Sequence, residues 1–400
     1  KTGTSYLRHL VARGGQPRTP ELDQGLLVYA YGSYDKSDLV AIDLSTLRWE
    51  SVTGWEESQL IAEDGTILFR RGEGSLVARS PEGAERVGPL PDYLRPPQSD
   101  AASLAVTKGD LLFTTESGIS VLNAGPDGAF LTFDDLAPVP VAAFAGKTLA
   151  GMAAGGGNAV VTLYDPAASS LKVSGVALLR PSGGSLQAAT TVPLASVGEI
   201  RQWTPPAISE RIVAWSEQTG GSIALRYQIV RGTTLLPVNA LDCQHFEAMS
   251  SASWSCNGAL WAGVEVHMMA ASEGMLMVQF ARAEVAPPYQ STRIVLFDPG
   301  ADVAFGTADD RLYEVPMGNL VAQRPMAGRV STGFSGGRVG FIASSLDASA
   351  QVYLWDRLSG ALLQKTSHFS EKNELHLAPS GRMVWRDSLF DSYSTVVWLP

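Results

Sequence analysis

Two acidic segments, which align with each other without gaps, carry the clearest chemical signal in the sequence. Residues 123–135 read NAGPDGAFLTFDD and residues 298–310 read DPGADVAFGTADD. Hard cations such as Ca²⁺ take about six to eight oxygen ligands from carboxylates and loop carbonyls. A glycine-containing turn lets carbonyl groups point inward, and Asp holds its oxygens on a short side chain. The two segments therefore predict a calcium site at one or both loops.

Each acidic loop contributes four oxygen-bearing side chains to this prediction. The second loop has Asp298, Asp302, Asp309 and Asp310, and the first loop has Asn123, Asp127, Asp134 and Asp135 at the same positions. The second loop is the stronger candidate, because it has a carboxylate where the first has an amide. The alternative is that these side chains only bond their own backbone in turns, with no ion bound.

Both cysteines of the chain, Cys243 and Cys256, lie in its least regular segment. A disulfide between them would close a short loop and stabilise the fold by constraining the unfolded chain. The alternative is two unpaired, buried thiols. Together with His245 and His267 they could form a zinc site, but the spacing lacks the close pairs typical of one. We expect a disulfide, and this favours an oxidising, extracytoplasmic location.

The irregular segment, at about residues 240–270, also carries two tryptophans. Inserted loops on a rigid scaffold are common binding surfaces. Trp254 and Trp261 could therefore stack on a sugar or on a partner's side chain. The alternative is that both rings pack in the interior.

Composition limits the classes of protein that the chain can belong to. Its 400 residues are 45% hydrophobic and 18% charged, which is enough apolar material for a large core. No apolar run is long enough for a membrane-spanning helix. The net charge of −10 argues against binding to nucleic acid or to an anionic membrane, because both need a cationic face.

Short β-rich runs separated by tight turns repeat along the whole chain. Residues 59–90, for example, contain QLIAED, TILFRR, SLVAR and AERVGPL with turns between them. A turn followed by a wholly apolar strand recurs as EDGTILF, TKGDLLF, SGGRVGFI and PSGRMVW, and such strands are typical of stacked sheets. The repeating units begin near residues 17, 59, 103, 149, 201, 250, 328 and 374. Four-stranded repeats of this length predict a β-propeller.

The expected architecture is one all-β domain over residues 1–400, a single propeller of about eight four-stranded blades. Seven blades are the alternative, because the fourth and sixth units are irregular. The last unit supplies only three strands, so we expect the N-terminal strand, residues 4–11, to complete its sheet and close the ring.

The turn-plus-apolar-strand pattern, together with strands that end in Asp and a short polar turn (VAIDLSTLRW, VYLWDRLSGALL), resembles TolB-like and WD-repeat propellers. The acidic segments resemble the FGT-x-DD loops of secreted bacterial propellers. These resemblances imply a propeller fold and a secreted, periplasmic or cell-surface setting with abundant Ca²⁺. They do not define an activity, because propellers host enzymes, lectins and scaffolds alike.

The function we expect from the sequence is a non-enzymatic binding or scaffold module that presents its loops to a protein or glycan partner. The alternative is a lyase or hydrolase with its site in the axial cleft, with candidate residues His376, Glu374, Arg201 and Glu63. No catalytic residue is assigned. GFSGG at residues 333–337 fits a serine-hydrolase motif, but that motif needs a helix after the serine. A strand pattern follows Ser335, which predicts a hairpin turn there.

Overall fold

The computed structural model describes residues 7–10, 21–89 and 104–399, apart from residues 142–148, 165–172, 194–205, 243–244, 246–255, 284–289, 325–330 and 389–393 and shorter gaps. All elements with bounds in these residues are β-strands, β1–β36. Within this part of the chain, no helix has the length and apolar character needed to cross a bilayer.

The described strands pair into eight small sheets, and successive strands are antiparallel. The first sheet contains β2 (Glu21–Asp23), β3 (Leu26–Ser33), β4 (Lys36–Asp43) and β5 (Arg48–Trp55). The second contains β6 (Glu57–Ile61), β7 (Ile67–Arg70), β8 (Ser75–Arg79) and β9 (Glu85–Pro89). The third contains β10 (Leu104–Thr107), β11 (Asp110–Thr115), β12 (Gly118–Asn123) and β13 (Leu136–Pro140). The fourth contains β14 (Leu149–Gly155), β15 (Asn158–Tyr164), β16 (Val173–Ser182) and β17 (Ser185–Pro193).

The fifth sheet is the least regular. It contains β18 (Ala207–Ile208), β19 (Ile212–Thr219), β20 (Ser222–Arg231), β24 (Leu260–Ala262) and β23 (Cys256–Asn257), with β21 (Thr234–Leu235) and β22 (Asn239–Ala240) also paired to β20. Part of the predicted insertion therefore extends this sheet. The expected start of the sixth unit near residue 250 was too early, because the next sheet begins at residue 265.

The sixth and eighth sheets have four strands again, and the seventh has five. The sixth contains β25 (Glu265–Ser272), β26 (Met275–Ala283), β27 (Gln290–Asp298) and β28 (Arg311–Glu314). The seventh contains β29 (Val321–Ala322), β30 (Thr332–Ser335), β31 (Arg338–Ser344), β32 (Gln351–Asp356) and β33 (Leu362–Gln364). The eighth contains β34 (Glu371–Leu377), β35 (Met383–Ser388), β36 (Ser394–Leu399) and β1 (Leu7–Leu10). In it, Leu7 lies opposite Trp398 and Leu10 lies opposite Thr395.

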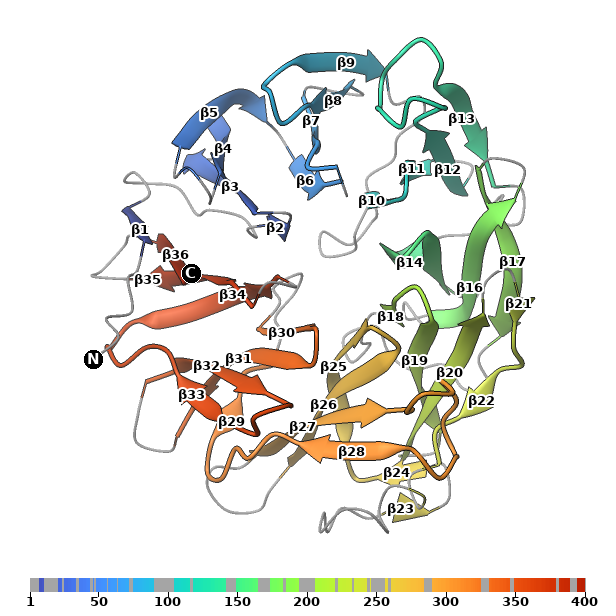
Figure 1. Cartoon of the computed structure of the whole chain (residues 1–400), viewed down its shortest axis with the longest axis vertical. Coiled ribbons are helices and arrows are strands. Elements are labelled where there is room, and N and C mark those ends of the chain that lie inside the picture. Colours follow the sequence, from blue (N-terminus) through green and yellow to red (C-terminus); the bar gives the residue numbers. More distant parts are fainter. Residues whose placement is uncertain are drawn as a thin grey trace.

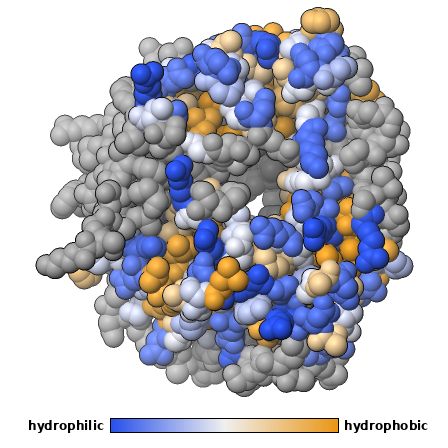
Figure 2. Space-filling view, viewed as in Figure 1, coloured by the Kyte–Doolittle hydropathy of each residue, from blue (hydrophilic) through white to orange (hydrophobic). Residues whose placement is uncertain are grey.

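The sheets stand around a common centre, with one strand of each sheet nearest to it (Figure 1). These inner strands are β2, β6, β10, β14, β18, β25, β30 and β34, and each one contacts the next. The space-filling view shows a hollow at this centre, with hydrophilic and hydrophobic residues mixed around it (Figure 2).

The core lies between neighbouring sheets, as the wholly apolar strands require. Strand β11, DLLFTT, is buried at every position because sheets cover both of its faces. Leu68 and Leu76 of the second sheet share one apolar cluster with Phe113 of the third. Ile342 of the seventh sheet shares another with Trp385 of the eighth. The turns predicted before such strands are present, and Gly65 at one of them has a φ of 85°, which favours glycine.

Candidate functional site

The two acidic loops have the same backbone hydrogen bonds. In the loop between β12 and β13, Asp135 accepts bonds from the backbone N–H groups of Leu131 (2.6 Å) and Thr132 (3.1 Å). In the loop between β27 and β28, Asp310 accepts from Gly306 (2.6 Å) and Thr307 (3.2 Å) at the matching positions. The duplication seen in the sequence is therefore a duplication of structure.

The remaining acidic positions match in the same way. Asp127 accepts from Ala129 N–H and Asp302 accepts from Ala304 N–H, both at 2.8 Å. The hydroxyl of Thr132 donates to Asp134 (2.6 Å) and lowers the pKa of that carboxyl, and Thr307 does the same for Asp309. Each carboxylate is thus bonded to its own loop, as the ion-free alternative requires.

The first loop is the better of the two for holding a cation. Carboxylate oxygens of Asp127, Asp134 and Asp135 lie within 4.8 Å of one another. Since each carboxylate has more acceptor positions than its backbone bonds use, this oxygen set suits Ca²⁺. Calcium at these loops remains a prediction. The preference for the second loop was based on Asp298, whose carboxylate is paired with Arg357.

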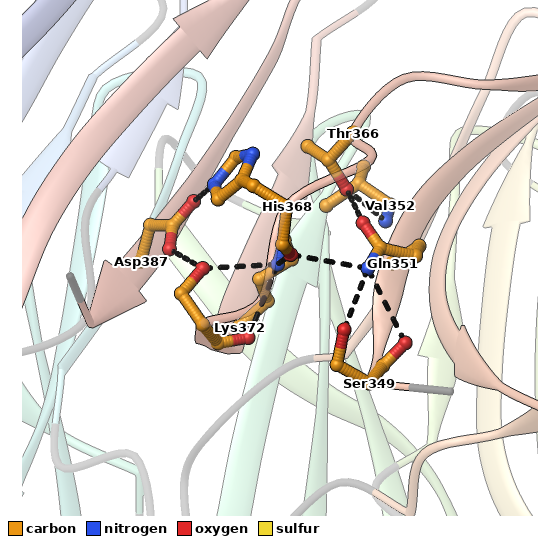
Figure 3. Close-up of polar contacts among 8 residues, drawn as sticks. Ser349, Gln351, Val352, Thr366, His368, Lys372 and Asp387 are labelled. Carbon is orange, nitrogen blue, oxygen red and sulfur yellow. Dashed lines mark hydrogen bonds and ion pairs between the residues drawn. The ribbon is translucent and has the colours of Figure 1, made fainter. Parts of the chain in front are cut away.

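A second cluster of polar groups lies in the eighth sheet (Figure 3). The buried Asp387 of β35 accepts hydrogen bonds from the hydroxyl of Ser370 and from Nε2 of His368 at 2.7 Å, with that imidazole tautomer assigned as the donor. The ammonium group of Lys372, on β34, donates to Oγ of Ser370 at 3.0 Å. It also donates to the backbone carbonyls of His368 (2.9 Å) and Ser370 (3.1 Å). A hydroxyl, an amine, a carboxylate and an imidazole are thus in direct contact.

The strand register explains why these groups meet. Lys372 on β34 lies directly opposite Asp387 on β35. Both side chains are fully buried, and burial lowers the pKa of the lysine while Asp387 opposes that shift. A buried ammonium is tolerated only with hydrogen-bond partners, and the hydroxyl of Ser370, which also contacts Asp387, is one of the partners of Lys372.

A neighbouring blade supports the cluster. Gln351 of β32, in the seventh sheet, donates from its amide to the carbonyl of His368 at 3.1 Å (Figure 3). Its own amide oxygen accepts from the hydroxyl of Thr366 at 2.6 Å. The loop that carries His368 and Ser370 is therefore attached to two sheets.

The axial candidates on β34 lie next to this cluster. Glu374 is buried and is paired with the buried Arg386 at 2.7 Å. His376 is half-buried, and its Nε2 has no hydrogen-bond partner among the described residues. Burial lowers the pKa of His376 to about 4, so its imidazole is neutral at pH 7. The other two axial candidates, Arg201 and Glu63, lie outside the described residues.

The structure describes only some of the residues predicted to have a role in the insertion. Cys243 and Trp254 lie outside the described residues, as does the side chain of Cys256, so the disulfide remains a prediction. Trp261 is buried and stacks on Phe280 with ring centroids 4.8 Å apart, which is the packing role kept as the alternative.

The two histidines considered as zinc ligands have different neighbours. His245 lies 3.2 Å from Asp310 in the second acidic loop. His267 lies on β25 against Gln290 (3.4 Å) and Glu265 (3.6 Å). Ser335 lies in a hairpin between β30 and β31, as expected from the strand pattern that follows it.

Sequence reasoning missed Ser370, Lys372 and Asp387. A signal was present in the segment SHFSEKNELH, where His368, Ser370 and Lys372 recur at every second position. That spacing places side chains on one side of an extended chain. The pairing with Asp387 depends on the register of two strands, which the pattern alone does not define.

The fold is similar to solved β-propellers. The propeller of Dos1 matches over 98% of this chain and 94% of that chain, with 9% identity and a TM-score of 0.56. A prolyl endopeptidase matches over 96% of this chain and 46% of that chain, with 14% identity and a TM-score of 0.51. A puromycin-hydrolysing peptidase of Mycobacterium tuberculosis matches over 96% and 50%, with 11% identity and a TM-score of 0.47. This chain thus spans about half the length of these peptidases. No protein-family model and no curated protein matches the sequence.

These comparisons confirm a propeller-type, all-β fold and correct the predicted function. The expectation of a non-enzymatic binding or scaffold module is contradicted, because the neighbours include a prolyl endopeptidase, which is a hydrolase. The physical reason for the error is that loops on a rigid ring serve binding and catalysis equally well, so loop composition does not separate the two functions.

Proposed function

We propose that this chain has a hydrolase-type function and that Ser370 is its nucleophile. The observation that carries the proposal is the contact of the Ser370 hydroxyl with both Asp387 and the ammonium of Lys372. A serine hydroxyl is a weak nucleophile until an adjacent group takes its proton. Here the hydroxyl already donates to a carboxylate, and Ser370 is only half-buried, so a substrate can approach it.

The proposed reaction is acyl transfer to Ser370. Its Oγ forms a bond to the carbonyl carbon of an ester or amide while its proton passes to the carboxylate of Asp387. The leaving alkoxide or amine then takes that proton as its bond to the carbonyl carbon breaks. Water hydrolyses the acyl group from Ser370 by the same route. Lys372 places a positive charge beside Oγ, where negative charge develops, and His368 holds the second oxygen of Asp387.

The experiment is a comparison of two serine variants on a panel of p-nitrophenyl esters and short peptide amides. Ser370→Ala should lower kcat/KM by at least about a hundredfold. Ser359→Ala is the matched control, because its hydroxyl also donates to an aspartate, Asp356 (3.2 Å), but among the described residues it has no hydrogen bond with a lysine. Labelling by a fluorophosphonate should modify Ser370 in the unaltered protein. Unchanged hydrolysis by Ser370→Ala would refute the assignment.

We also propose that the ring has eight blades and that β1 closes it. Eight sheets among the described strands, the contacts between successive inner strands and the pairing of β1 with β36 support this. Deleting residues 1–10 should then lower the melting temperature, since it exposes the edge of β36.

Three further predictions from the sequence are each tested by a separate experiment. Calcium in the acidic loops is tested by melting the protein with chelator and with added Ca²⁺. The Cys243–Cys256 disulfide is tested by the protein's mass before and after reduction and alkylation. An extracytoplasmic location is tested by fractionating the cells that produce the protein.

A further inference from the structure

One buried amide of the seventh sheet reaches the cluster around Ser370 (Figure 3). Gln351 of β32 is 7% exposed, and its Nε2 donates to the carbonyl of His368 at 3.1 Å and to Oγ of Ser349 at 2.8 Å. Its Oε1 accepts from the buried hydroxyl of Thr366 at 2.6 Å. Both polar ends of this side chain are therefore bonded within the protein.

The hydroxyl of Thr366 determines which end of this amide faces His368. The hydroxyl accepts from the backbone N–H of Val352 at 3.0 Å, so its single hydrogen is free to donate to Gln351. The group that receives this hydrogen must be the amide oxygen, and the amide nitrogen then faces the carbonyl of His368. The hydrogen-bond network thus fixes Gln351 as a donor to this carbonyl.

The carbonyl of His368 has a second donor, the ammonium of Lys372, at 2.9 Å. An ammonium has three hydrogens, and among the described residues the other two acceptors are the carbonyl of Ser370 (3.1 Å) and its Oγ (3.0 Å). Because Lys372 is fully buried, the position of its ammonium depends on these acceptors. A shift of the His368 carbonyl would therefore move a positive charge relative to the hydroxyl of Ser370.

We propose that Gln351 is a positioning residue for the proposed hydrolysis. From the seventh sheet it holds the carbonyl of His368, and through this carbonyl it holds the ammonium of Lys372 beside Oγ of Ser370. The inference rests on the proposed role of Ser370 as the nucleophile. Gln351 acts through its neighbours rather than on the substrate, and a displacement of about 1 Å in a reacting site can cost about a hundredfold in rate. Two neighbouring sheets thus build the site together.

The sixth sheet offers a matched control, because it contains the same arrangement at another boundary between sheets. Gln279 of β26 is fully buried, and its Oε1 accepts from the hydroxyl of Thr332 at 2.7 Å. Its Nε2 donates to the carbonyl of Gln323 at 2.9 Å. Thr332 lies on β30 and Gln323 follows β29, and both strands belong to the seventh sheet. A substitution at Gln279 therefore disturbs the same kind of contact outside the cluster around Ser370.

The test compares kcat of Gln351→Glu and Gln279→Glu with that of the unaltered protein on p-nitrophenyl esters. A protonated carboxyl group donates to the His368 carbonyl as the amide does, whereas an ionised one cannot donate and repels the carbonyl oxygen. Relative to the unaltered protein, kcat of Gln351→Glu should be nearly the same at about pH 5 and at least about tenfold lower at about pH 9. The ratio isolates the introduced group, because His368, Lys372 and Asp387 titrate in every protein compared. Gln279→Glu should keep the kcat of the unaltered protein at both pH values.

A second variant covers the case in which the introduced charge unfolds the protein. Gln351→Met removes the donor without adding a charge, so it should lower kcat by a similar factor at every pH. Far-UV circular dichroism at the assay temperature verifies that each variant is folded.

The outcomes separate the positioning role from the proposed function. A kcat lowered only by the substitutions at Gln351 supports the inference, since a purely structural contact would affect both glutamines alike. Unchanged kcat in folded Gln351→Met, or equal losses in Gln351→Glu and Gln279→Glu, would overturn the inference, while loss of activity in Ser370→Ala would still support the proposed nucleophile. Full activity in Ser370→Ala would overturn both.

Discussion

Replacing Lys372 with methionine should destabilise the protein sharply, although the new side chain is apolar and of similar length. The lysine is fully buried opposite Asp387, and its ammonium satisfies two carbonyl groups and the hydroxyl of Ser370. Methionine leaves the carbonyl groups of His368 and Ser370 and the hydroxyl of Ser370 without their donor, and it removes the positive charge opposite the buried carboxylate of Asp387. Leaving a buried polar group without its partner costs about 1–3 kcal/mol, so we expect a total loss of about 4 kcal/mol.

This cost corresponds to a measurable change in melting temperature. Unfolding entropy is about 2.1 cal/mol/K per residue, or about 0.8 kcal/mol/K for a 400-residue chain. A loss of about 4 kcal/mol therefore lowers the melting temperature by about 5 °C. Thermal unfolding followed by far-UV circular dichroism gives this number directly.

A double variant distinguishes loss of the buried positive charge opposite Asp387 from simple damage to packing. Lys372→Met combined with Asp387→Leu removes both buried charges, so it should recover at least half of the lost stability. A single variant as stable as the unaltered protein, or a double variant no more stable than the single one, would show that the charges do not govern this sheet.

Two further predictions concern acid stability and loop geometry. Burial lowers the pKa of His267 to about 4, below the value of 6.5 in the unfolded chain, so its contribution is fully present above pH 6.5 and is lost as the pH falls towards 4. His267→Gln can keep a hydrogen bond with Gln290 but cannot take up a proton, so it should reduce the loss of stability at acid pH by about 3 kcal/mol. Urea unfolding at several pH values measures this. If the free energy of unfolding depends on pH in the same way in both proteins, the argument is wrong. In the first acidic loop, Gly125→Ala should cost about 3 kcal/mol, because φ is 67° and a Cβ would lie 2.5 Å from the carbonyl oxygen of Asp134. Gly128→Ala, with a φ of 71° but open space around the Cβ, should cost only about 1 kcal/mol, and equal losses would refute the steric argument.

The propeller fold could be predicted because its signals are local. The turn at Gly65 and the wholly apolar strand after it need only a few consecutive residues to be recognised. The duplicated acidic loops were equally visible, since Thr132 and Thr307 bond carboxylates two and three residues away.

The candidate site could not be predicted because its contacts are not local. Ser370 lies in the loop before β34 and Asp387 lies on β35, and their meeting depends on the pairing of β34 with β35, whose register includes an irregularity between Asn373 and His376. The same limit explains the second acidic loop, whose pairing with Arg357 joins positions far apart in the sequence. Ion pairs between residues so far apart in the sequence can be recognised only when the positions of the neighbouring sheets are known.

The pairing of β1 with β36 has a consequence for synthesis in the cell. During synthesis β1 emerges from the ribosome long before β36, the strand with which it pairs. Until then β1 has no place in a sheet, and the other strands of the eighth sheet do not yet exist. Contacts over so large a sequence separation form slowly, and incomplete chains expose strand edges that aggregate. Production of this protein should therefore depend on chaperones that shield the early strands until β36 has been synthesised.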